Sequence, residues 1–576
     1  MNIDHTIKIT LKSRWLFPTA YVVVVASVIF CIFYLFSDYN YLAGWYLRIN
    51  DCFYRHDHWQ NDFFNAQTKQ QGNILCVAGL IICTVILYCL ITRLKRPFSS
   101  LEIQFSKRDL LAIIFCMLAG TGAWIWGYSL VHQGFDEVFS AVNCASLPPF
   151  QTLSYYMLPN NHILFNLINS TLFHFAADKV FTGKLISLVC LWGIMIVVYT
   201  WLSDIIKNRY LLVLAVIVLC FQFPIWGFSF QARGYELCTL AKWFAFLSMM
   251  RYVSSRNSQW LYYFALACIA GYFCMPVFVY YYGAIVLFAL FWMAYTRKTD
   301  SKFWKTQLGI VLIVYLLYLP AFCFSGLHAM VGNQYVAARI HNLNEFYAEG
   351  QHFFALYLNF FTSNFTKDHP ISDIILFLAP LALFCFYKNN SAVLCGFFYL
   401  ALWLSSIGIA YAMKIYPIER TMTAHVSISL GLSVYTIYLA LLKINGLFKM
   451  PLAADLVLTV LLIGAGIRVA IGNPANISFG LYNNDINLKY DLLMHEGVEF
   501  IPGGSSIAFS DECFYWYYLC KIRGDKVSNC PAGNEQYFVR FGSDPFPAGY
   551  AGKYVLVKTV FEQKITPVGY QIYKRR

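Results

Sequence analysis

The chain has 576 residues, of which 59% are hydrophobic and only 12% are charged, and its mean hydropathy is +0.55. This composition excludes an ordinary soluble enzyme and describes a protein whose surroundings are mainly lipid. The formal net charge of +13 forms no concentrated basic face, which argues against nucleic acid as a partner.

Apolar runs long enough to cross a bilayer recur along the chain. A hydrocarbon core about 30 Å thick needs about 20 residues of helix. We predict about thirteen spans, at 15–37, 74–93, 109–131, 185–203, 210–228, 236–251, 260–275, 277–296, 307–324, 373–388, 391–412, 422–442 and 452–471. The first span is too long for a signal-peptide core, so it is expected to remain as an anchor.

Lysine and arginine in the connections set the orientation, because short cytoplasmic loops retain positive charge. One alternate set of connections is rich in these residues, namely Lys8, Lys12, Arg14, Arg93, Lys95, Arg96, Lys107, Arg108, Lys207, Arg209, Arg251, Arg256, Arg297, Lys298, Lys302 and Lys305. The opposite connections are longer and carry few positive charges. We therefore predict an integral protein of a bacterial plasma membrane with a cytoplasmic N-terminus. Because the predicted number of spans is odd, the C-terminal tail is expected outside.

Two adjacent acids, Asp136 and Glu137, open the loop that follows the span 109–131, on the predicted outer side. Carboxylates at the exit of a membrane helix are costly unless they face water, a substrate or a cation. The pair is therefore a candidate catalytic site. The alternative is a solvated loop or a helix N-cap.

The segment 161–176 is apolar but short, since sixteen residues of helix span only about 24 Å. Asn166, Asn169 and Ser170 are spaced among its apolar residues, as in a helix that lies along the membrane surface. Counting this segment as a span would invert the charge alternation of every later connection. We therefore expect an interfacial helix.

Two later outer turns supply positive charges. Arg233 lies between the spans 210–228 and 236–251, and Lys414 and Arg420 lie between the spans 391–412 and 422–442. The planar donors of arginine suit phosphate, and a lysine adds a point charge. The competing explanation is that arginine at a helix end contacts lipid head groups.

The tail, about 472–576, loses the long apolar runs and alternates in hydropathy at 553–558, as a half-buried strand does. It is expected to form a small α/β domain on the same side as the acid pair. Cys520 and Cys530 lie in it, and an outward-facing domain could oxidise them to a disulfide. The alternative is that both thiols stay reduced.

An acid pair, a surface helix and an arginine-tyrosine turn follow one another here as Asp136-Glu137, 161–176 and 231–235. This order resembles the GT-C superfamily of membrane glycosyltransferases, which includes protein O-mannosyltransferases and the aminoarabinose transferases that modify lipid A. The resemblance is architectural and covers about 109–442.

The resemblance implies an all-α polytopic membrane fold with interfacial helices and a small outer α/β domain. The expected division is 1–108 for an N-terminal pair of spans, 109–471 for the catalytic membrane region and 472–576 for the outer domain. It also implies transfer of a sugar from a polyprenyl-phosphate donor to a hydroxyl group of a glycan, lipid or protein acceptor, with inversion at the anomeric carbon.

In that chemistry Asp136 is the expected general base, because an alcohol is a poor nucleophile while it is protonated. Partial desolvation and the neighbouring Glu137 would raise the pKa of Asp136 unless a cation lies nearby.

The expected binding residues follow from the same resemblance. Arg233, Arg420 and Lys414 would hold the donor phosphate, whose negative charge grows as the bond to the sugar breaks. Asn161, His162 and Tyr235 would orient the sugar or the phosphate. Many relatives have His-Pro-Pro-Leu or Lys-Pro-Pro-Leu near 160–164, where this chain has Asn-Asn-His-Ile-Leu.

Other functions have weaker support in the sequence. The acidic loop has no Asp-x-Asp motif, so no motif supports a divalent metal, although a requirement for one stays possible. A transporter or flippase of lipid-linked saccharides is the rival class, because Lys242 and Arg468 fall within predicted spans. A polymerase or ligase of surface glycans is closer in chemistry and stays an alternative.

Overall fold

The computed structural model describes residues 6–12, 16–94, 100–156, 158, 160–331, 340–362, 371–448, 453–479, 484–530, 532–542, 544, 546–547, 550, 552–560 and 569–576. Within these residues, nine helices are long and apolar enough to cross a membrane. They are α1 (Leu16–Phe36), α4 (Ala66–Leu94), α5 (Lys107–Leu130), α9 (Lys179–Leu202), α14 (Val279–Thr296), α15 (Ser301–Val331), α18 (Asn390–Met413), α19 (Thr423–Phe448) and α20 (Ala453–Phe479).

A tenth span is formed if the bent pair α10 (Arg209–Cys220) and α11 (Phe223–Ser229), which meet at 69°, crosses as one unit. The remaining predicted spans differ from expectation. The helix α13 (Gln259–Cys274) has 16 residues, and the segment 371–386 is divided between α17 (Ile371–Leu378) and the 3-10 helix η4 (Ala379–Phe386). The predicted fold class is nevertheless confirmed, since the chain is a helical, integral membrane protein with a small C-terminal sheet.

The helix α12 (Tyr235–Ser255) is long but carries Glu236, Lys242 and Arg251. It packs between α9, α13 and α19, and Glu236 and Lys242 are almost completely buried. Protein rather than lipid surrounds α12, so polar side chains are tolerated on it that would be costly on a lipid-facing helix. For this reason its average hydropathy does not mark it as a span.

The shorter helices lie mainly between these long ones. They are α2 (Tyr39–Ile49), α3 (His56–Asp62), α6 (Phe135–Ser140), the π-helix η2 (Ala141–Ala145), α7 (Pro149–Ser154), α8 (Ile163–Leu172), η3 (Pro276–Phe278), α16 (Leu343–Thr362), η5 (Glu419–Met422), α21 (Asn484–Phe500), η6 (Asp511–Cys513) and α22 (Phe514–Arg523). The expected surface segment is thus α8, a helix of ten residues. At about 1.5 Å per residue, α8 is too short to cross a bilayer.

The strands form two separate sheets. An antiparallel pair joins β1 (Thr6–Lys12) to β2 (Ser100–Ser106). The C-terminal sheet has the order β4-β3-β5-β7-β6, with β3 (Ser506–Phe509), β4 (Lys526–Ser528), β5 (Tyr537–Phe541), β6 (Tyr554–Val560) and β7 (Tyr570–Arg575). In this sheet β3 pairs in parallel with both β4 and β5, and β7 pairs antiparallel with β5 and β6.

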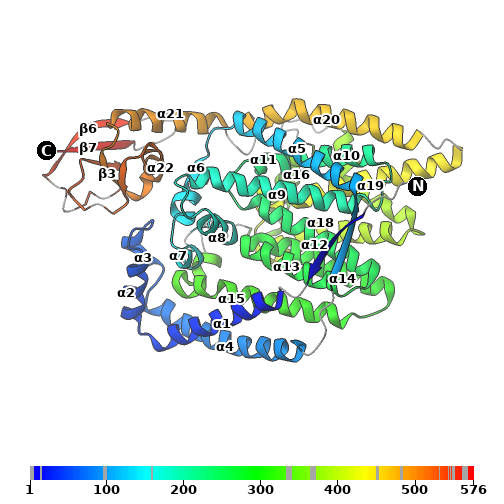
Figure 1. Cartoon of the computed structure of the whole chain (residues 1–576), viewed down its shortest axis with the longest axis horizontal. Coiled ribbons are helices and arrows are strands. Elements are labelled where there is room, and N and C mark those ends of the chain that lie inside the picture. Colours follow the sequence, from blue (N-terminus) through cyan, green and yellow to red (C-terminus); the bar gives the residue numbers. More distant parts are fainter. Residues whose placement is uncertain are drawn as a thin grey trace.

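In Figure 1 most long helices run across the view, and the C-terminal sheet lies at the left, at the same end of the molecule as α6. The ring of Phe514 on α22 lies 4.6 Å from that of Phe135 and 5.2 Å from that of Phe139, both on α6. The hydroxyl of Tyr518 donates to Asp178 at 2.8 Å. The acid pair and the tail therefore share one end, as the sequence predicts.

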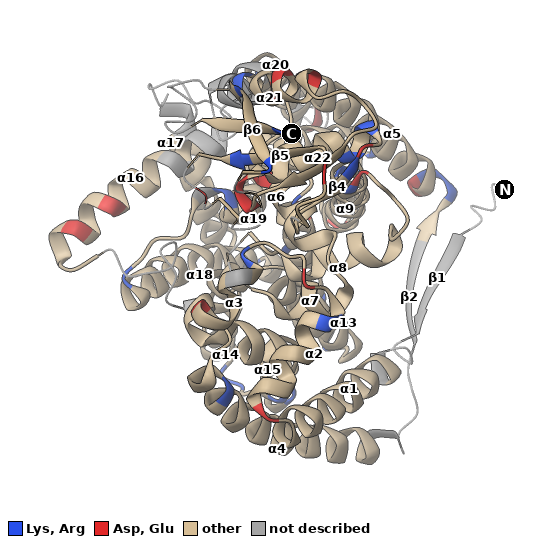
Figure 2. Cartoon of the chain, turned by 90° about the vertical axis from the view of Figure 1, so that its left-hand side faces the viewer, with Lys and Arg blue, Asp and Glu red and all other residues tan. Residues whose placement is uncertain are grey.

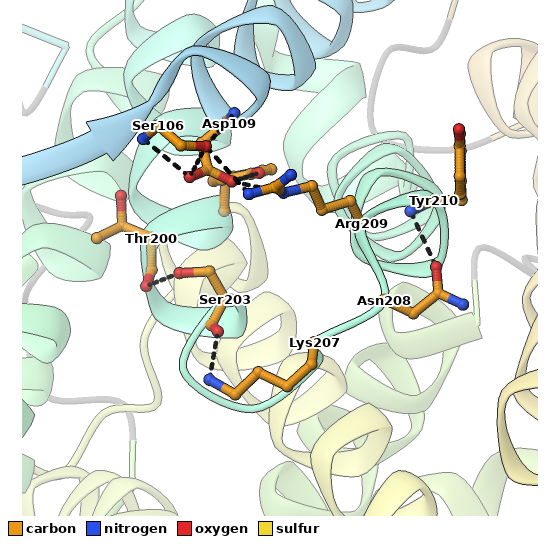
Figure 3. Close-up of polar contacts among 9 residues, drawn as sticks. Ser106, Asp109, Thr200, Ser203, Lys207, Asn208, Arg209 and Tyr210 are labelled. Atoms are coloured by element: carbon orange, nitrogen blue, oxygen red, sulfur yellow. Dashed lines mark hydrogen bonds and ion pairs between the residues drawn. The ribbon is translucent and has the colours of Figure 1, made fainter. Parts of the chain in front are cut away.

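The opposite end is held by polar contacts that join three elements (Figure 3). Asp109 and Ser106 form a capping box at the start of α5. Arg209, the first residue of α10, donates to Asp109 at 3.2 Å and to Ser106 at 3.0 Å. One arginine that the charge pattern assigns to topology therefore also fixes how two helices begin.

Neither of the two alternatives for Cys520 and Cys530, a bond between them or two reduced thiols, is correct. Cys530 is bonded to Cys52, which lies between α2 and α3 and is 478 residues away in the sequence, and Cys520 is a buried free thiol. Spacing within the tail could not identify this partner, because Cys52 belongs to the loop after the first span. The bond ties that loop to the C-terminal domain.

Candidate active site

A cavity of about 410 Å³ lies at the end of the molecule that carries α6. Its polar lining residues are Asp136, Tyr156, Asn160, His162, Arg233, Tyr235, Arg420 and Thr421, and its apolar wall is formed by Met275, Pro276, Val277, Val279, Tyr280, Phe322, Met413, Ile415, Tyr416, Pro417 and Ile418. Acidic and basic segments meet beside α6 and α19 when this end is viewed directly (Figure 2). Polar and apolar walls thus share one cavity.

Two arginines converge on Asp136 in this cavity. Arg233 lies 2.6 Å from a carboxylate oxygen of Asp136, and Arg420 lies 3.6 Å from the same oxygen. Arg233 is only 4% exposed, and it also donates to the side-chain oxygen of Asn160 at 2.9 Å. Both guanidinium groups lie over the ring of Tyr235, at 5.0 and 5.9 Å from its centroid. One carboxylate therefore faces two positive charges.

The charge of Arg233 lowers the pKa of Asp136 from its ordinary value, with a further contribution from Arg420, although burial acts in the opposite direction. The sequence predicts a raised pKa for Asp136 unless a cation lies nearby. Arg233, 97 residues away in the sequence, is that cation, so the pKa is lowered instead.

Glu137 does not line the cavity. Its buried carboxylate accepts the backbone N–H of Ala232 at 2.7 Å and that of Gly134 at 3.0 Å, and it lies 3.9 Å from the ammonium group of Lys184. Because Ala232 precedes Arg233, Glu137 fixes the backbone that carries the arginine. Lys184 was not singled out from the sequence, and the only signal for it is a lysine directly beside an apolar span.

His162 lines the cavity with its ring 5.0 Å from that of Tyr235. Its Nδ1 accepts the backbone N–H of Gly234 at 2.7 Å, so the neutral ring carries its proton on Nε2. Burial, reinforced by Arg233 and Arg420, lowers the pKa of His162 well below its usual value. His162 is therefore a neutral hydrogen-bond donor.

Asn161 is not part of the cavity lining. Its amide donates to the carbonyls of Thr152 and Tyr155, and its oxygen accepts from Asn166, all within 3.0 Å. The neighbouring Asn160 lies in the cavity instead. The sequence carries no signal that separates two adjacent asparagines, because the choice depends on the backbone of the loop.

Lys414 ends α18 in a left-handed conformation, and its exposed side chain is not among those that line the cavity. Of the predicted site residues, the structure thus brings together Asp136, Arg233, Arg420, His162 and Tyr235. Glu137 and Asn161 lie behind this cluster, and Lys414 lies outside it.

Among the described residues, potential metal ligands gather in a group of three at Asp51, Cys52 and Cys530, away from this cavity. The two cysteines of that group are bonded to each other.

No family model matches the sequence, and no curated protein matches it. Among solved structures, the chain is similar to the crystal structure of ArnT from Cupriavidus metallidurans, in which that protein is bound to undecaprenyl phosphate. The two chains share 10% identity, the match covers 80% of this chain and 97% of ArnT, and the TM-score is 0.48. This likeness concerns the course of the backbone, and no residue is given a role from it.

Proposed function

We propose that the protein is a membrane glycosyltransferase that moves a sugar from a polyprenyl-phosphate donor to a hydroxyl acceptor at the cavity around Asp136. The observation that carries the proposal is the pairing of two arginines with one carboxylate inside a cavity whose other wall is apolar. A lipid-linked phosphate is a ligand that matches both walls.

The charge balance favours an anionic ligand. Arg233 and Arg420 bring two positive charges, and Asp136 compensates only one of them. The Nε atoms of both arginines are buried and have no acceptor among the described residues. An uncompensated charge in a protein interior is costly, and a phosphate group would compensate it with strong, charge-assisted hydrogen bonds.

The apolar wall favours a lipid attached to that phosphate. It is built largely from two short segments, 275–280 before and within α14 and 413–418 at and after the end of α18. Tyr416 in the second segment packs against Phe353 on α16, with ring centroids 4.7 Å apart. A hydrocarbon chain removed from water along such a wall gains roughly 25 cal/mol for each Å² that is buried.

In the proposed reaction, the acceptor hydroxyl gives its proton to Asp136 as its oxygen forms a bond to the anomeric carbon. The bond between that carbon and the phosphate oxygen breaks, and the electron pair leaves with the lipid phosphate. Arg233 and Arg420 stabilise the charge that grows there. His162 and Asn160 would orient the sugar, and attack opposite the leaving group would invert the anomeric carbon.

Donor binding would also prepare the base. One oxygen of Asp136 contacts both arginines. A phosphate that takes over part of these contacts would weaken the hold on Asp136 and let its pKa rise toward the ordinary value of about 3.9.

The contacts of Lys242, a residue that suggested a transporter, do not favour that alternative. Lys242 is buried, and its ammonium group donates to the backbone carbonyl of Thr421 at 2.8 Å, which connects α12 to the turn that carries Arg420. This contact supports a structural role rather than a place on a transport path.

The first test is the binding of a polyprenyl phosphate to the purified protein in nanodiscs. Arg233→Ala should weaken binding roughly ten- to hundredfold, because a hydrogen bond to a charged group contributes about 1.5–3 kcal/mol. Arg251→Ala is the matched control, since Arg251 is an ion-paired arginine near the far end of α12, the helix that begins two residues after Arg233. Equal affinity of both variants would remove Arg233 from the donor site.

A further inference from the structure

The cavity around Asp136 contains two polar groups that the proposed contacts with phosphate leave unused. Tyr156 and His162 line this cavity and are almost completely buried. The hydroxyl of Tyr156 and the Nε2 atom of His162 have no hydrogen-bond partner among the described residues. Most buried polar groups in proteins are paired, so unpaired groups that line a cavity are available to a ligand.

Tyr156 is held in place by its surroundings. It belongs to a buried apolar cluster with Ile163, Phe273 and Tyr318, and its backbone N–H donates to the hydroxyl of Ser325 on α15 at 2.7 Å. Burial raises the pKa of Tyr156 above its ordinary value, so its hydroxyl stays protonated. The residue therefore offers the cavity a fixed, neutral group that can both donate and accept a hydrogen bond.

His162 offers a second neutral group of a different kind. Its Nδ1 already accepts the backbone N–H of Gly234, so the ring can only donate, from Nε2. A sugar hydroxyl can accept this hydrogen bond and can also exchange one with Tyr156. An ammonium group only donates, so it finds no acceptor on His162.

The charges of the lining are balanced without a charge on the sugar. Within the described part of the lining, the charged residues are Asp136, Arg233 and Arg420. Two positive charges and one negative charge leave a single positive charge, which the one negative charge of a sugar-linked phosphodiester compensates. Outside the lining, Lys242 adds a positive charge behind the backbone of Thr421, so the surroundings also disfavour a cation.

A cationic amino sugar has no free counter-charge in this arrangement. Asp136 is already engaged by both arginines, and the neighbouring Glu137 faces Lys184 and the backbone of Ala232 rather than the cavity. The amino sugar would therefore bury an unpaired positive charge or lose a proton. Each pKa unit by which the amino group must be shifted costs about tenfold in binding.

We propose that Tyr156 and His162 form the sugar-recognising part of the cavity and that the transferred sugar is uncharged, such as a hexose or an N-acetylated hexosamine. The arginines hold the phosphate, and the hydroxyls of the sugar bind to Tyr156 and His162. This inference rests on the proposed function, because it concerns the sugar end of the same donor.

The test compares three donors in the displacement of a labelled polyprenyl phosphate from the full-length protein in nanodiscs. The donors are glucosyl polyprenyl phosphate, its analogue with an amino group at the fourth carbon of the sugar, and the N-acetylated form of that analogue. The amino analogue should bind at least about tenfold more weakly than the glucosyl donor. Acetylation should restore most of the affinity, because it removes the charge although it adds bulk.

Two variants locate the effect in the cavity. Tyr156→Phe should weaken binding of the glucosyl donor about two- to tenfold, as expected for one neutral hydrogen bond, and should leave the affinity for polyprenyl phosphate without a sugar unchanged. Tyr210→Phe, which removes an exposed hydroxyl on α10, is the matched control. Asn160→Asp adds a second carboxylate beside Arg233, so the preference for the glucosyl donor over the amino analogue should fall about tenfold.

The outcomes separate this inference from the proposed function. If polyprenyl phosphate without a sugar does not bind, the proposed function fails and the inference fails with it. If that lipid binds but the amino analogue binds as tightly as the glucosyl donor, or acetylation weakens binding further, only the assignment of the sugar is overturned. The assignment of Tyr156 is overturned if Tyr156→Phe leaves both affinities unchanged or lowers them equally, since the residue would then act on the structure alone.

Discussion

Asp136 illustrates what a single residue contributes to the site and what its neighbours change. Its type and its position after a membrane helix were visible in the sequence, and these two features made it a candidate. Its ionisation was not visible, because the pKa depends on Arg233 and Arg420, which are distant along the chain. The same limit explains why Asn160 and Asn161 could not be told apart.

The lowered pKa of Asp136 predicts a specific pH dependence of transfer. Because the pKa of Asp136 is lowered in the free enzyme, kcat/KM should keep its value to a lower pH than it would with an ordinary aspartate as the base. With the donor bound, the arginines are shared, so the acid limb of kcat should lie at a higher pH than that of kcat/KM. Steady-state rates with a radiolabelled donor and extracted acceptor check this order.

Asp136→Asn is the control for that profile. It should abolish turnover while donor binding stays at least as tight, because the arginines are left free for phosphate. Turnover close to that of the natural protein would contradict the assignment of Asp136 as the base. The ionised carboxylate of Asp136 also contributes to folding stability. Because its pKa is lowered in the folded protein, this contribution is present above the unfolded pKa and is lost as the pH falls through the folded pKa.

At the scale of elements, the sequence predicted the long apolar helices well, because hydropathy is a local property. It was less successful for α12 and for the segment 371–386, where burial against other helices or a change to 3-10 geometry decides the outcome. The cavity around Asp136 is a further example. Its polar residues come from α6, the loop before α8, the start of α12 and the turn before α19, and only the packing of these elements brings them together.

The contact between Glu137 and Lys184 is predicted to position the start of α12. Their side chains are 3% and 6% exposed, so Glu137→Gln leaves a buried lysine without its partner. A loss of roughly 3 kcal/mol in unfolding free energy is expected, together with weaker donor binding. Thermal and denaturant unfolding in detergent measure the first effect.

A double variant separates positioning from catalysis at Glu137. In Glu137→Gln with Lys184→Met, neither charge remains, so much of the stability and of the donor affinity should return. If the double variant is stable but still cannot turn over, Glu137 acts on the reaction itself.

At the scale of the whole molecule, membrane and tail parts are joined by aromatic packing at Phe514, by the hydroxyl of Tyr518 and by one covalent bond. The loss of long apolar runs near residue 472 predicts a separate tail. The cross-link was not predictable, since eighteen cysteines allow many pairings and most of them lie in apolar segments.

Removal of the bond between Cys52 and Cys530 is predicted to loosen the C-terminal domain without unfolding the membrane helices. A disulfide typically contributes about 2–4 kcal/mol, mainly by restricting the unfolded chain. Cys530→Ser should therefore speed hydrogen exchange in α22 and α6 and leave α9 unchanged. Cys89→Ser, at an exposed free thiol, is the control. Unchanged exchange in α22 would mean that aromatic packing alone holds the domain.

The same bond has a consequence for how the protein is made. Cys52 leaves the ribosome 478 residues before Cys530. During almost all of synthesis the loop between α2 and α3 therefore carries an unpaired thiol. A chain that ends before Cys530 leaves the thiol of Cys52 free to react. Formation of the disulfide therefore follows synthesis of the tail rather than insertion of the last helix.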